Sequence, residues 1–576
     1  MRQPSLDGFS NRQEKSDPFH SKSSTSTPDS VNTVNGQKPG EMAAVIEPLN
    51  GRQSLSRVSD PFPQAIDMRL AWVCGAGIVA LSCVIALTGY SPHDESWFLR
   101  VLERVNAGET LYRDVYYPLL PLAVYVGAAA TFIFGPNFLV LQALFAACFV
   151  ATAWICDSLA RQLEISRVGR ALLLLGVCVW SSPAAINHVW SLYQPMATLF
   201  LLLCLRMVLA WSRQTVEKRK RIELAVAAIA AGAGFATKDQ VGALTLVALL
   251  ISVTAVAVHR KFSVSQLLRT VAGVVTVFIG TVLLILVPVM VWGGLEQLAE
   301  YFVVEREAFV RTSSISYFDG IDHFFRSMIR FAFIRDPFEV LHFSFFLLAP
   351  LAIVSLIVVL FRHRGEDRIR SAVLLAFSTG AWLAIFPRSD IWHVLFVSAM
   401  TVVGLLYAAD RLFRSPMPRN MIFGLAFVCL SVGFAEAVYA SAVRVIVLKF
   451  DFLRLPHFQY AMMSHSNIDE LRQNRVKLQA VATTGPLFLL THEAAFYYLI
   501  TNIKNPTPID YPVAGSMGRD GEGKMIRAIQ SHENSLVCLR SYPEPALRPE
   551  RLENFVRTQM LLVGRLGVCD LYQSMK

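Results

Sequence analysis

HDESWFLRVLERVNAGETLYRDVYYPLLP (93–121) is the stretch that decides how this chain is interpreted, because it closely follows an apolar run at about 68–90. That run is long enough to cross a bilayer as one helix, so Asp94 and Glu95 are expected at a membrane surface. A partly desolvated carboxylate has a raised pKa unless cations offset the effect, which suits a base that takes a proton from an alcohol. We therefore predict that this acidic pair is the catalytic centre of a membrane enzyme, with only one of the two pointing into the site, because adjacent residues do not share a helix face. A pair that only caps or solvates a helix end is the alternative.

The composition indicates a membrane protein. The chain has 576 residues, of which 54% are hydrophobic and 17% charged, with a mean hydropathy of +0.45. Apolar runs recur from residue 68 to about 447, as expected of a chain that crosses the bilayer many times. The net charge of +10 does not indicate nucleic acid, because the basic residues lie in short loops between apolar runs.

Two other regions differ from this pattern. Residues 1–67 are polar and contain few large apolar residues, so we expect a disordered cytoplasmic segment without a cleaved signal peptide. Most cysteines lie in apolar stretches, where they behave as small hydrophobes. Cys538 and Cys569 lie in the polar C-terminal region and would be able to form a disulfide if that region is outside the cytoplasm. No Cys/His cluster indicates a metal.

Basic clusters give the expected orientation. The positive-inside rule places all of them in the cytoplasm, and alternating the apolar runs between them predicts roughly 11–13 membrane helices. The clusters are at 161–170, 212–221, 259–261, 362–370 and 411–419. The runs are at about 68–90, 118–160, 171–190, 196–211, 222–236, 241–258, 270–292, 339–361, 371–387, 392–409 and 420–445.

One run is ambiguous. Residues 118–160 are too long for a single span and are interrupted by Gly135, Pro136 and Asn137. They could form a juxtamembrane or re-entrant helix followed by a span, or a tight pair of spans. The second arrangement would invert every later loop and place the basic clusters outside.

Polar insertions collect on the face opposite the basic clusters. They are at 93–118, 187–195, 237–242 and 387–393, and a longer segment at about 292–337 has the aromatic and charged pattern of a helix lying along the membrane interface. A lysine at 238 would bind a phosphate as a point charge, and Arg388 and His393 would hold a phosphate or assist a leaving group. For each residue alone, a snorkelling or solvated side chain is the competing interpretation.

Charged neighbours complete the candidate site. Asp239 and Asp390 lie beside these cations, and Arg113 either pairs locally with Asp114 or faces the site. One carboxylate loop and two cationic loops on the same side would suit an anionic lipid-linked substrate. No Walker loop or GxGxxG motif indicates a nucleotide donor.

After about residue 448 the composition becomes that of a soluble domain. Strands are predicted near 487–490 and 536–539, with helices near 493–501 and within GKMIRAIQSHENSLVCLRSY (523–542). The domains expected are therefore a membrane catalytic domain at 68–447 and a small extracytoplasmic α/β domain at 448–576.

Together these stretches resemble the GT-C membrane glycosyltransferases, above all the protein O-mannosyltransferase and aminoarabinose transferase groups and their bacterial relatives. The resemblance lies in the acidic pair with Gly108, Tyr112, Arg113, Asp114 and Pro118, in GAGFATKDQVGALTLVALL (232–250) and in PRSDIWHVLFVSAM (387–400). It implies an all-α polytopic membrane bundle with a small C-terminal α/β domain, and a bacterial inner (plasma) membrane location with the active site outside the cytoplasm.

The same resemblance implies transfer of a sugar, with inversion, from a polyprenyl-phosphate donor to a glycan, lipid or protein acceptor. Asp94 would be the general base, with Glu95 beside it, and Lys238, Arg388 and His393 would bind the donor phosphate. Many relatives carry an acidic residue in the second external loop, where this chain has Tyr193, Gln194 and Pro195. Glu95, Asp239 and Asp390 are possible substitutes for that acidic residue, but we assign no divalent metal and expect no other cofactor. A transporter or flippase of a lipid-linked saccharide remains the alternative function.

Overall fold

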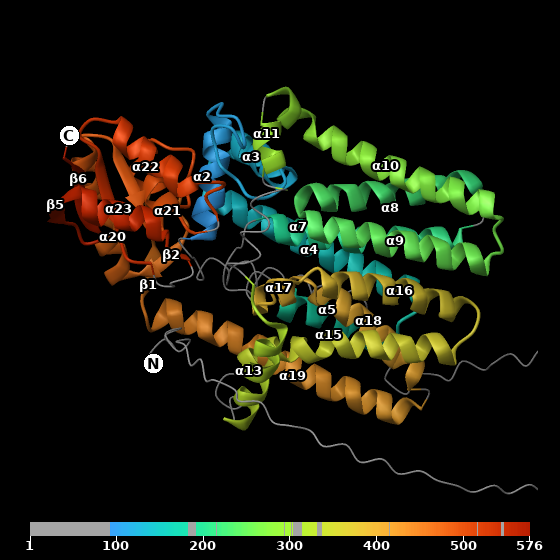
Figure 1. The fold of residues 1–576 in the computed structure, drawn as a ribbon. Helices are drawn as coiled ribbons and strands as arrows, with labels where there is room; N and C mark the ends of the chain where they lie inside the picture. Colours follow the sequence, from blue (N-terminus) through green and yellow to red (C-terminus); the bar gives the residue numbers. More distant parts are fainter. Residues whose placement is uncertain are drawn as a thin grey trace, which may run out of the picture. The chain divides into compact units, whose positions relative to one another are not determined.

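The computed structural model describes residues 93–575, except 182–191, 215, 293, 301, 303–313, 331–336, 414, 515 and 543–546. The segment at 1–67 and the first apolar run at 68–90 lie outside the described residues. Long helices lie side by side in a bundle, and the small strands belong to the C-terminal part of the chain (Figure 1).

A helix occupies each predicted apolar run after the first. These are α3 (Leu122–Phe134), α4 (Phe138–Gln162), α5 (Arg167–Ser181), α7 (Tyr193–Arg213), α8 (Glu217–Thr237), α9 (Asp239–His259), α10 (Val264–Val291), α15 (Pro337–Arg362), α16 (Glu366–Leu383), α18 (Ser398–Leu412) and α19 (Pro416–Ile446). Shorter helices between or before them are α2 (Asp94–Asn106), α11 (Leu295–Glu300), α13 (Tyr317–Ile329) and α17 (Ile391–Phe396).

Six of the described helices are long and apolar enough to cross a membrane, namely α4, α7, α9, α10, α15 and α19. The helices α5, α8, α16 and α18 are shorter or more polar and pack against these six. Most side chains of α10 are exposed, including Leu268, Leu284 and Val291. An apolar surface of this length is stable in contact with lipid rather than water, which agrees with the predicted polytopic membrane protein.

The ambiguous run at 118–160 forms two helices that are separated at Gly135, Pro136 and Asn137, where the sequence predicted the break. Gly135 has a φ of +83°, and the Asn137 side chain accepts from the Leu139 N–H to cap α4. Thirteen residues make α3 too short to span the roughly 30 Å hydrocarbon core. The pair therefore has the geometry of a short helix followed by a span.

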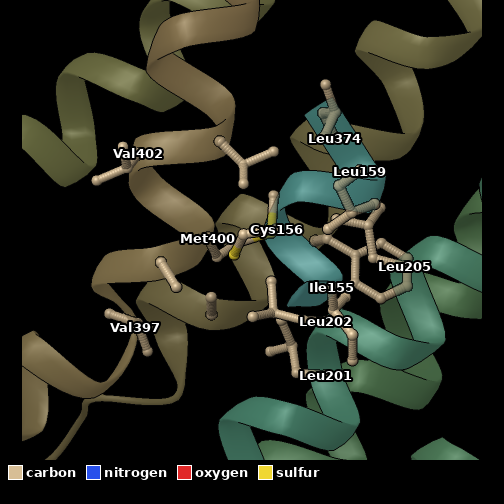
Figure 2. Close-up of a cluster of buried hydrophobic side chains, with 14 of the residues drawn as sticks. Ile155, Cys156, Leu159, Leu201, Leu202, Leu205, Leu374, Val397, Met400 and Val402 are labelled. Carbon is tan, nitrogen blue, oxygen red and sulfur yellow. The ribbon is translucent and has the colours of Figure 1, made fainter. Parts of the chain in front are cut away.

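The core of the bundle lies where α4, α7, α16 and α18 meet (Figure 2). Branched and sulfur-containing side chains fill this region, among them Ile155, Cys156, Leu202, Leu205 and Leu374. All five are fully buried or nearly so. This packing holds four helices, far apart in the chain, in a fixed arrangement beneath the polar end described below.

All five basic clusters lie at one end of the bundle. The contacts that join them are Arg213 Nη2 to the Gln162 carbonyl, Arg260 Nη2 to the Ser212 carbonyl, Arg370 Nη2 to Glu164 Oε1 (3.0 Å), Arg411 Nη2 to the Leu163 carbonyl (3.2 Å) and the Ser166 N–H to Asp410 Oδ2 (2.7 Å). The other end of α4 meets the C-terminal region, where the Phe138 N–H donates to the His457 carbonyl at 2.7 Å. The basic clusters and the C-terminal region therefore lie at opposite ends of α4.

The C-terminal region is an α/β unit, as the sequence predicted. A two-stranded antiparallel ribbon of β1 (Phe450–Phe452) and β2 (Met462–Ser464) leads into α20 (His465–Ala482). A four-stranded sheet has the order β3-β4-β6-β5, in which only β3 and β4 are parallel. Its remaining elements are β3 (Leu487–Leu490), α21 (Ala494–Thr501), α22 (Gly521–Ser531), β4 (Leu536–Leu539), α23 (Glu550–Gln559), β5 (Met560–Arg565) and β6 (Asp570–Ser574).

A disulfide joins Cys538 on β4 to Cys569 just before β6, with the Cα atoms 5.4 Å apart. The sequence had left this pairing open. The bond closes a loop of 31 residues in the sheet domain.

Buried ion pairs fix α2 to the C-terminal domain. Asp510 is fully buried, and its carboxylate accepts from Arg104 Nη1 at 2.8 Å and lies 3.6 Å from Arg100 Nε. Glu103 and Glu109 give the two arginines second partners. Because buried charges are stable only when paired, this network sets the position of α2, which carries Asp94 at its first residue.

Asp510→Ala is expected to destabilise the protein by about 3 kcal/mol, because it leaves two buried arginines with one carboxylate fewer. Thermal unfolding of the purified protein measures the loss. Asp520→Ala is the matched control, since that carboxylate is exposed and its pairs with Arg527 and Arg551 are at the surface. Equal unfolding temperatures for the two variants would contradict a role of Asp510 at this junction.

Candidate active site

Asp94 is the first residue of α2 and is half-buried. Burial raises the pKa of its carboxyl to about 6, although the nearby charge of Arg388 lowers it and that of Asp390 raises it. This electrostatic coupling places the start of α2 close to the loop before α17, some 290 residues later in the chain. A carboxyl with such a pKa is ionised at pH 7 and only weakly acidic, as a general base requires.

The C-terminal domain reaches to within one residue of Asp94. The His93 ring packs against that of His492, which follows β3, with the ring centroids 3.9 Å apart and the planes tilted by 40°. His492 Nε2 lies 2.8 Å from Tyr511 Oη. Burial lowers the pKa of His93 to about 4 and that of His492 to about 3, so both imidazoles are neutral at pH 7. Sequence reasoning missed His492, because its neighbours come from a distant part of the chain.

The loop before α17 places a cation, a carboxylate and an imidazole together. Asp390 caps α17 by accepting from the His393 backbone N–H at 2.8 Å. The same carboxylate bonds His393 Nδ1 at 2.7 Å and accepts from Arg388 Nε at 2.7 Å. Burial alone would raise the pKa of Asp390, but His393 and Arg388 outweigh it and hold this pKa well below its usual range. Ile315 pairs with Pro387 and Ser389 through backbone hydrogen bonds and so fixes the loop.

Lys238 stands between α8 and α9, where an extended backbone separates the two helices. The helices approach closely because Gly242 has no Cβ; an added Cβ would lie 1.9 Å from the Phe235 nitrogen. Burial lowers the pKa of Lys238 to about 8, while the carboxylates of Asp390 and Asp239 raise it. The ammonium is therefore still charged at pH 7.

Gln194 joins these two cationic loops. It is buried at the start of α7, its Oε1 lies 3.5 Å from Lys238 Nζ, and its Nε2 lies 3.4 Å from His393 Nε2. Lys238 also lies over the Tyr193 ring, 5.7 Å from its centroid. In the sequence, Gln194 stood out only because many relatives carry an acidic residue in that loop. No sequence pattern separates a buried amide that bridges two side chains from an ordinary glutamine.

A pocket lies beside Gln194, Lys238 and His393, whose side chains form its polar part. The other lining residues are apolar except for Thr198: Ala197, Leu201, Val241, Ala381, Ala384, Val397 and Met400. Leu201, Val397 and Met400 also belong to the bundle core shown in Figure 2, so the core forms one wall of the pocket. The pocket therefore offers the Lys238 ammonium at its polar part and an apolar surface beyond.

Most of the predicted site residues are gathered at this end. Asp94, Lys238, Arg388, Asp390 and His393 are linked by contacts or by their mutual charges, and Asp239 lies next to Lys238. The roles of these residues stay predictions.

Three predicted residues are placed differently. Glu95 is 1% exposed within α2, where it belongs to the buried side of that helix. Arg113 forms an ion pair with Asp114 at 2.8 Å, and its side chain is 52% exposed. The other described contacts of Arg113, to Thr110 and Trp292, also lie outside the gathered cluster. The local pairing that the sequence offered as one possibility is thus the one observed.

The arrangement of a helical membrane bundle beside a small α/β domain is shared with solved structures of GT-C glycosyltransferases. Two crystal structures of ArnT, an aminoarabinose transferase from Cupriavidus metallidurans, have this fold. The ArnT structure bound to undecaprenyl phosphate has a TM-score of 0.52 and 14% identity, over 87% of this chain and 97% of ArnT. The apo structure gives 0.51 and 13%, over 88% and 98%.

A crystal structure of the Archaeoglobus fulgidus oligosaccharyltransferase, complexed with Zn and sulfate, has a TM-score of 0.48 and 11% identity, over 80% of this chain and 68% of that one. No protein-family model and no curated protein sequence matches the chain. The predicted fold class is confirmed by the likeness to ArnT.

Proposed function

We propose that this chain is an integral-membrane glycosyltransferase that moves a sugar from a polyprenyl-phosphate donor to an acceptor hydroxyl. The observation that carries the proposal is that Asp94, Arg388 and Lys238 are coupled by charge at one end of the bundle, where Lys238 also lines a pocket with mostly apolar walls. A lipid-linked donor has an anionic phosphate and an apolar tail, and this site offers partners for both. Undecaprenyl phosphate is bound in one ArnT structure that shares the fold.

The chemistry follows from the charges. The acceptor oxygen attacks the anomeric carbon, its proton passes to the Asp94 carboxylate, and the bond from that carbon to the phosphate oxygen breaks. Polyprenyl phosphate leaves with one additional negative charge, which Lys238 and Arg388 stabilise as it develops. A single displacement of this kind inverts the anomeric configuration.

The proposed site faces outside the cytoplasm. The five basic clusters lie at the opposite end of the bundle, and the positive-inside rule assigns that end to the cytoplasm. The chain would then be a bacterial inner-membrane protein whose donor is a lipid in the outer leaflet. Its acceptor is a glycan, lipid or protein of the envelope.

Incubation of the purified protein with polyprenyl-phosphate sugars and envelope acceptors tests the proposal. We expect a covalent glycosylated product and free polyprenyl phosphate, both identified by mass spectrometry. Movement of the lipid-linked sugar across a vesicle bilayer without any covalent product would instead establish the transporter. Mass analysis of envelope glycans and glycolipids in a deletion strain would identify the sugar and the acceptor.

The pH dependence of kcat/KM is expected to be bell-shaped, with limbs at about pH 6 and about pH 8. Asp94 accepts a proton only when ionised, so activity falls as pH drops through its pKa of about 6. Lys238 attracts phosphate only when charged, so activity also falls as pH rises through its pKa of about 8. Lys238→Arg should remove the alkaline limb, because arginine stays charged. An acid limb near pH 4 would contradict the role of Asp94.

A further inference from the structure

A series of side-chain hydrogen bonds runs from Lys238 to Arg388 through Gln194, His393 and Asp390, and each bond in it has a defined donor and acceptor. Lys238 Nζ lies 3.5 Å from Gln194 Oε1, and Gln194 Nε2 lies 3.4 Å from His393 Nε2. His393 Nδ1 lies 2.7 Å from Asp390 Oδ1, and Arg388 Nε donates to Asp390 Oδ2 at 2.7 Å. Gln194 is 2% exposed, so its amide has little access to water as an alternative partner.

The donor directions in this series follow from the chemistry of its ends. A lysine ammonium only donates, so the Gln194 oxygen must face Lys238 and the Gln194 amide N–H must face His393. An imidazole nitrogen that receives an N–H has to be unprotonated, so the proton of His393 is on Nδ1. That proton is donated to Asp390, a carboxylate that only accepts.

We propose that Gln194 is a positioning residue that holds His393 neutral, with its Nε2 occupied, and keeps Lys238 directed into the pocket. The proposal rests on the proposed function, since among the described residues of this cluster it leaves Lys238 and Arg388 as the cations for a donor phosphate. It gives His393 the role of a neutral hydrogen-bonding residue in place of the phosphate ligand that the sequence predicted.

The other charges around His393 agree with this assignment. Burial lowers the pKa of His393, Asp390 raises it, and Lys238 and Arg388 lower it again. Tyr193 contributes a hydroxyl 3.4 Å from Gln194 Nε2, and the carboxylates of Asp94 and Asp239 lie at the edges of the cluster. Two cations and an N–H donor facing the ring all favour the neutral imidazole.

Two substitutions at Gln194 should have opposite effects on the reactivity of the His393 Nε2 nitrogen at a given pH. Gln194→Glu keeps the size of the side chain but replaces the N–H donor with an acceptor, so Nε2 should become protonated and the pKa of His393 should rise. Gln194→Leu removes the hydrogen bond and leaves the Nε2 lone pair open. A side chain that only fills space would give changes in the same direction in both variants.

Diethyl pyrocarbonate modifies unprotonated imidazole nitrogen. Its reaction with the full-length protein therefore measures the availability of His393 Nε2 without any lipid. Peptide mapping across pH 5–9 should show low reactivity of His393 in the wild type and severalfold higher reactivity in Gln194→Leu. In Gln194→Glu the midpoint should move up by about 1 pH unit or more. His323 on α13, whose side chain is 37% exposed, is the internal control and should not change. Identical His393 profiles in all three proteins would overturn the proposal.

Binding of undecaprenyl phosphate forms the second part of the experiment. Gln194→Glu should weaken it at least tenfold, because the new carboxylate competes for Lys238 and repels the phosphate. Binding of undecaprenol, which has no phosphate, should not change. Gln479→Glu and Gln479→Leu on α20 are matched controls at an amide that only donates to the Thr501 carbonyl.

The two parts separate the two proposals. If the wild type does not bind undecaprenyl phosphate while the His393 profiles move in opposite directions, the proposed function fails and the role of Gln194 stands. If the wild type binds this lipid and the Gln194 variants match it in both measurements, the role of Gln194 fails and the proposed function stands.

Discussion

Asp94→Asn is expected to reduce sugar transfer by about 10²–10⁴, the range that general-base catalysis contributes to rate. Asparagine has the size of aspartate and retains hydrogen-bonding capacity, but it does not accept the acceptor hydroxyl proton. Removing the charge also removes the attraction between Asp94 and Arg388. Because the proposed phosphate ligands Lys238 and Arg388 are unchanged, turnover should fall much more than the affinity for undecaprenyl phosphate.

Initial rates with a polyprenyl-phosphate sugar, together with lipid affinity and protein level in the membrane, measure these effects separately. Asp469→Asn on α20 is the matched control, because that carboxylate is exposed and its contact with Arg472 is at the surface. Glu95→Gln tests the neighbouring acid, which lies inside α2 and should affect stability more than chemistry. Full activity of Asp94→Asn at normal protein level would exclude Asp94 as the base.

Much of the membrane architecture was predictable because the bilayer imposes a strong pattern on sequence. Apolar runs of about 15 residues or more, with basic loops between them, predicted the helices and the common location of the five clusters. The break at Gly135–Asn137 was predictable from turn residues, whereas the choice between two topologies for 118–160 required the length of α3. The number of apolar runs exceeds the number of described helices that are long and apolar enough to span a membrane by themselves, which is six. The helices α5, α8, α16 and α18 are not among the six, and they pack against other helices of the bundle.

The site was predictable to the extent that its members are charged residues at the ends of apolar runs. Asp94, Lys238 and Arg388 are costly to place at a membrane surface without a partner, so each was noticed in the sequence. Neither Gln194 nor Asp510 was predicted as a site or junction residue, because an amide or carboxylate shows its role only through partners that tertiary structure provides. For Arg113 the sequence left two possibilities open, and the structure shows the local surface pair with Asp114.

Lys238→Met is expected to lower kcat/KM for the polyprenyl-phosphate donor by about 10²–10³, the range found when one group that stabilises developing charge is removed. Methionine matches the length and apolar stem of lysine, so the approach of α8 to α9 at Gly242 should be preserved. Lys477→Met on α20 replaces an exposed lysine and serves as control. Unchanged kcat/KM in Lys238→Met would remove Lys238 from the mechanism.

The division of this loss between kcat and KM decides what Lys238 does. A ground-state contact with the donor phosphate would raise KM and leave kcat unchanged, whereas stabilisation of the leaving phosphate would lower kcat. The phosphate gains a full negative charge only as the glycosidic bond breaks, and the half-buried position of Lys238 strengthens its interaction with that charge. We therefore expect most of the effect in kcat. An effect confined to KM would leave Arg388 as the group that stabilises the leaving phosphate.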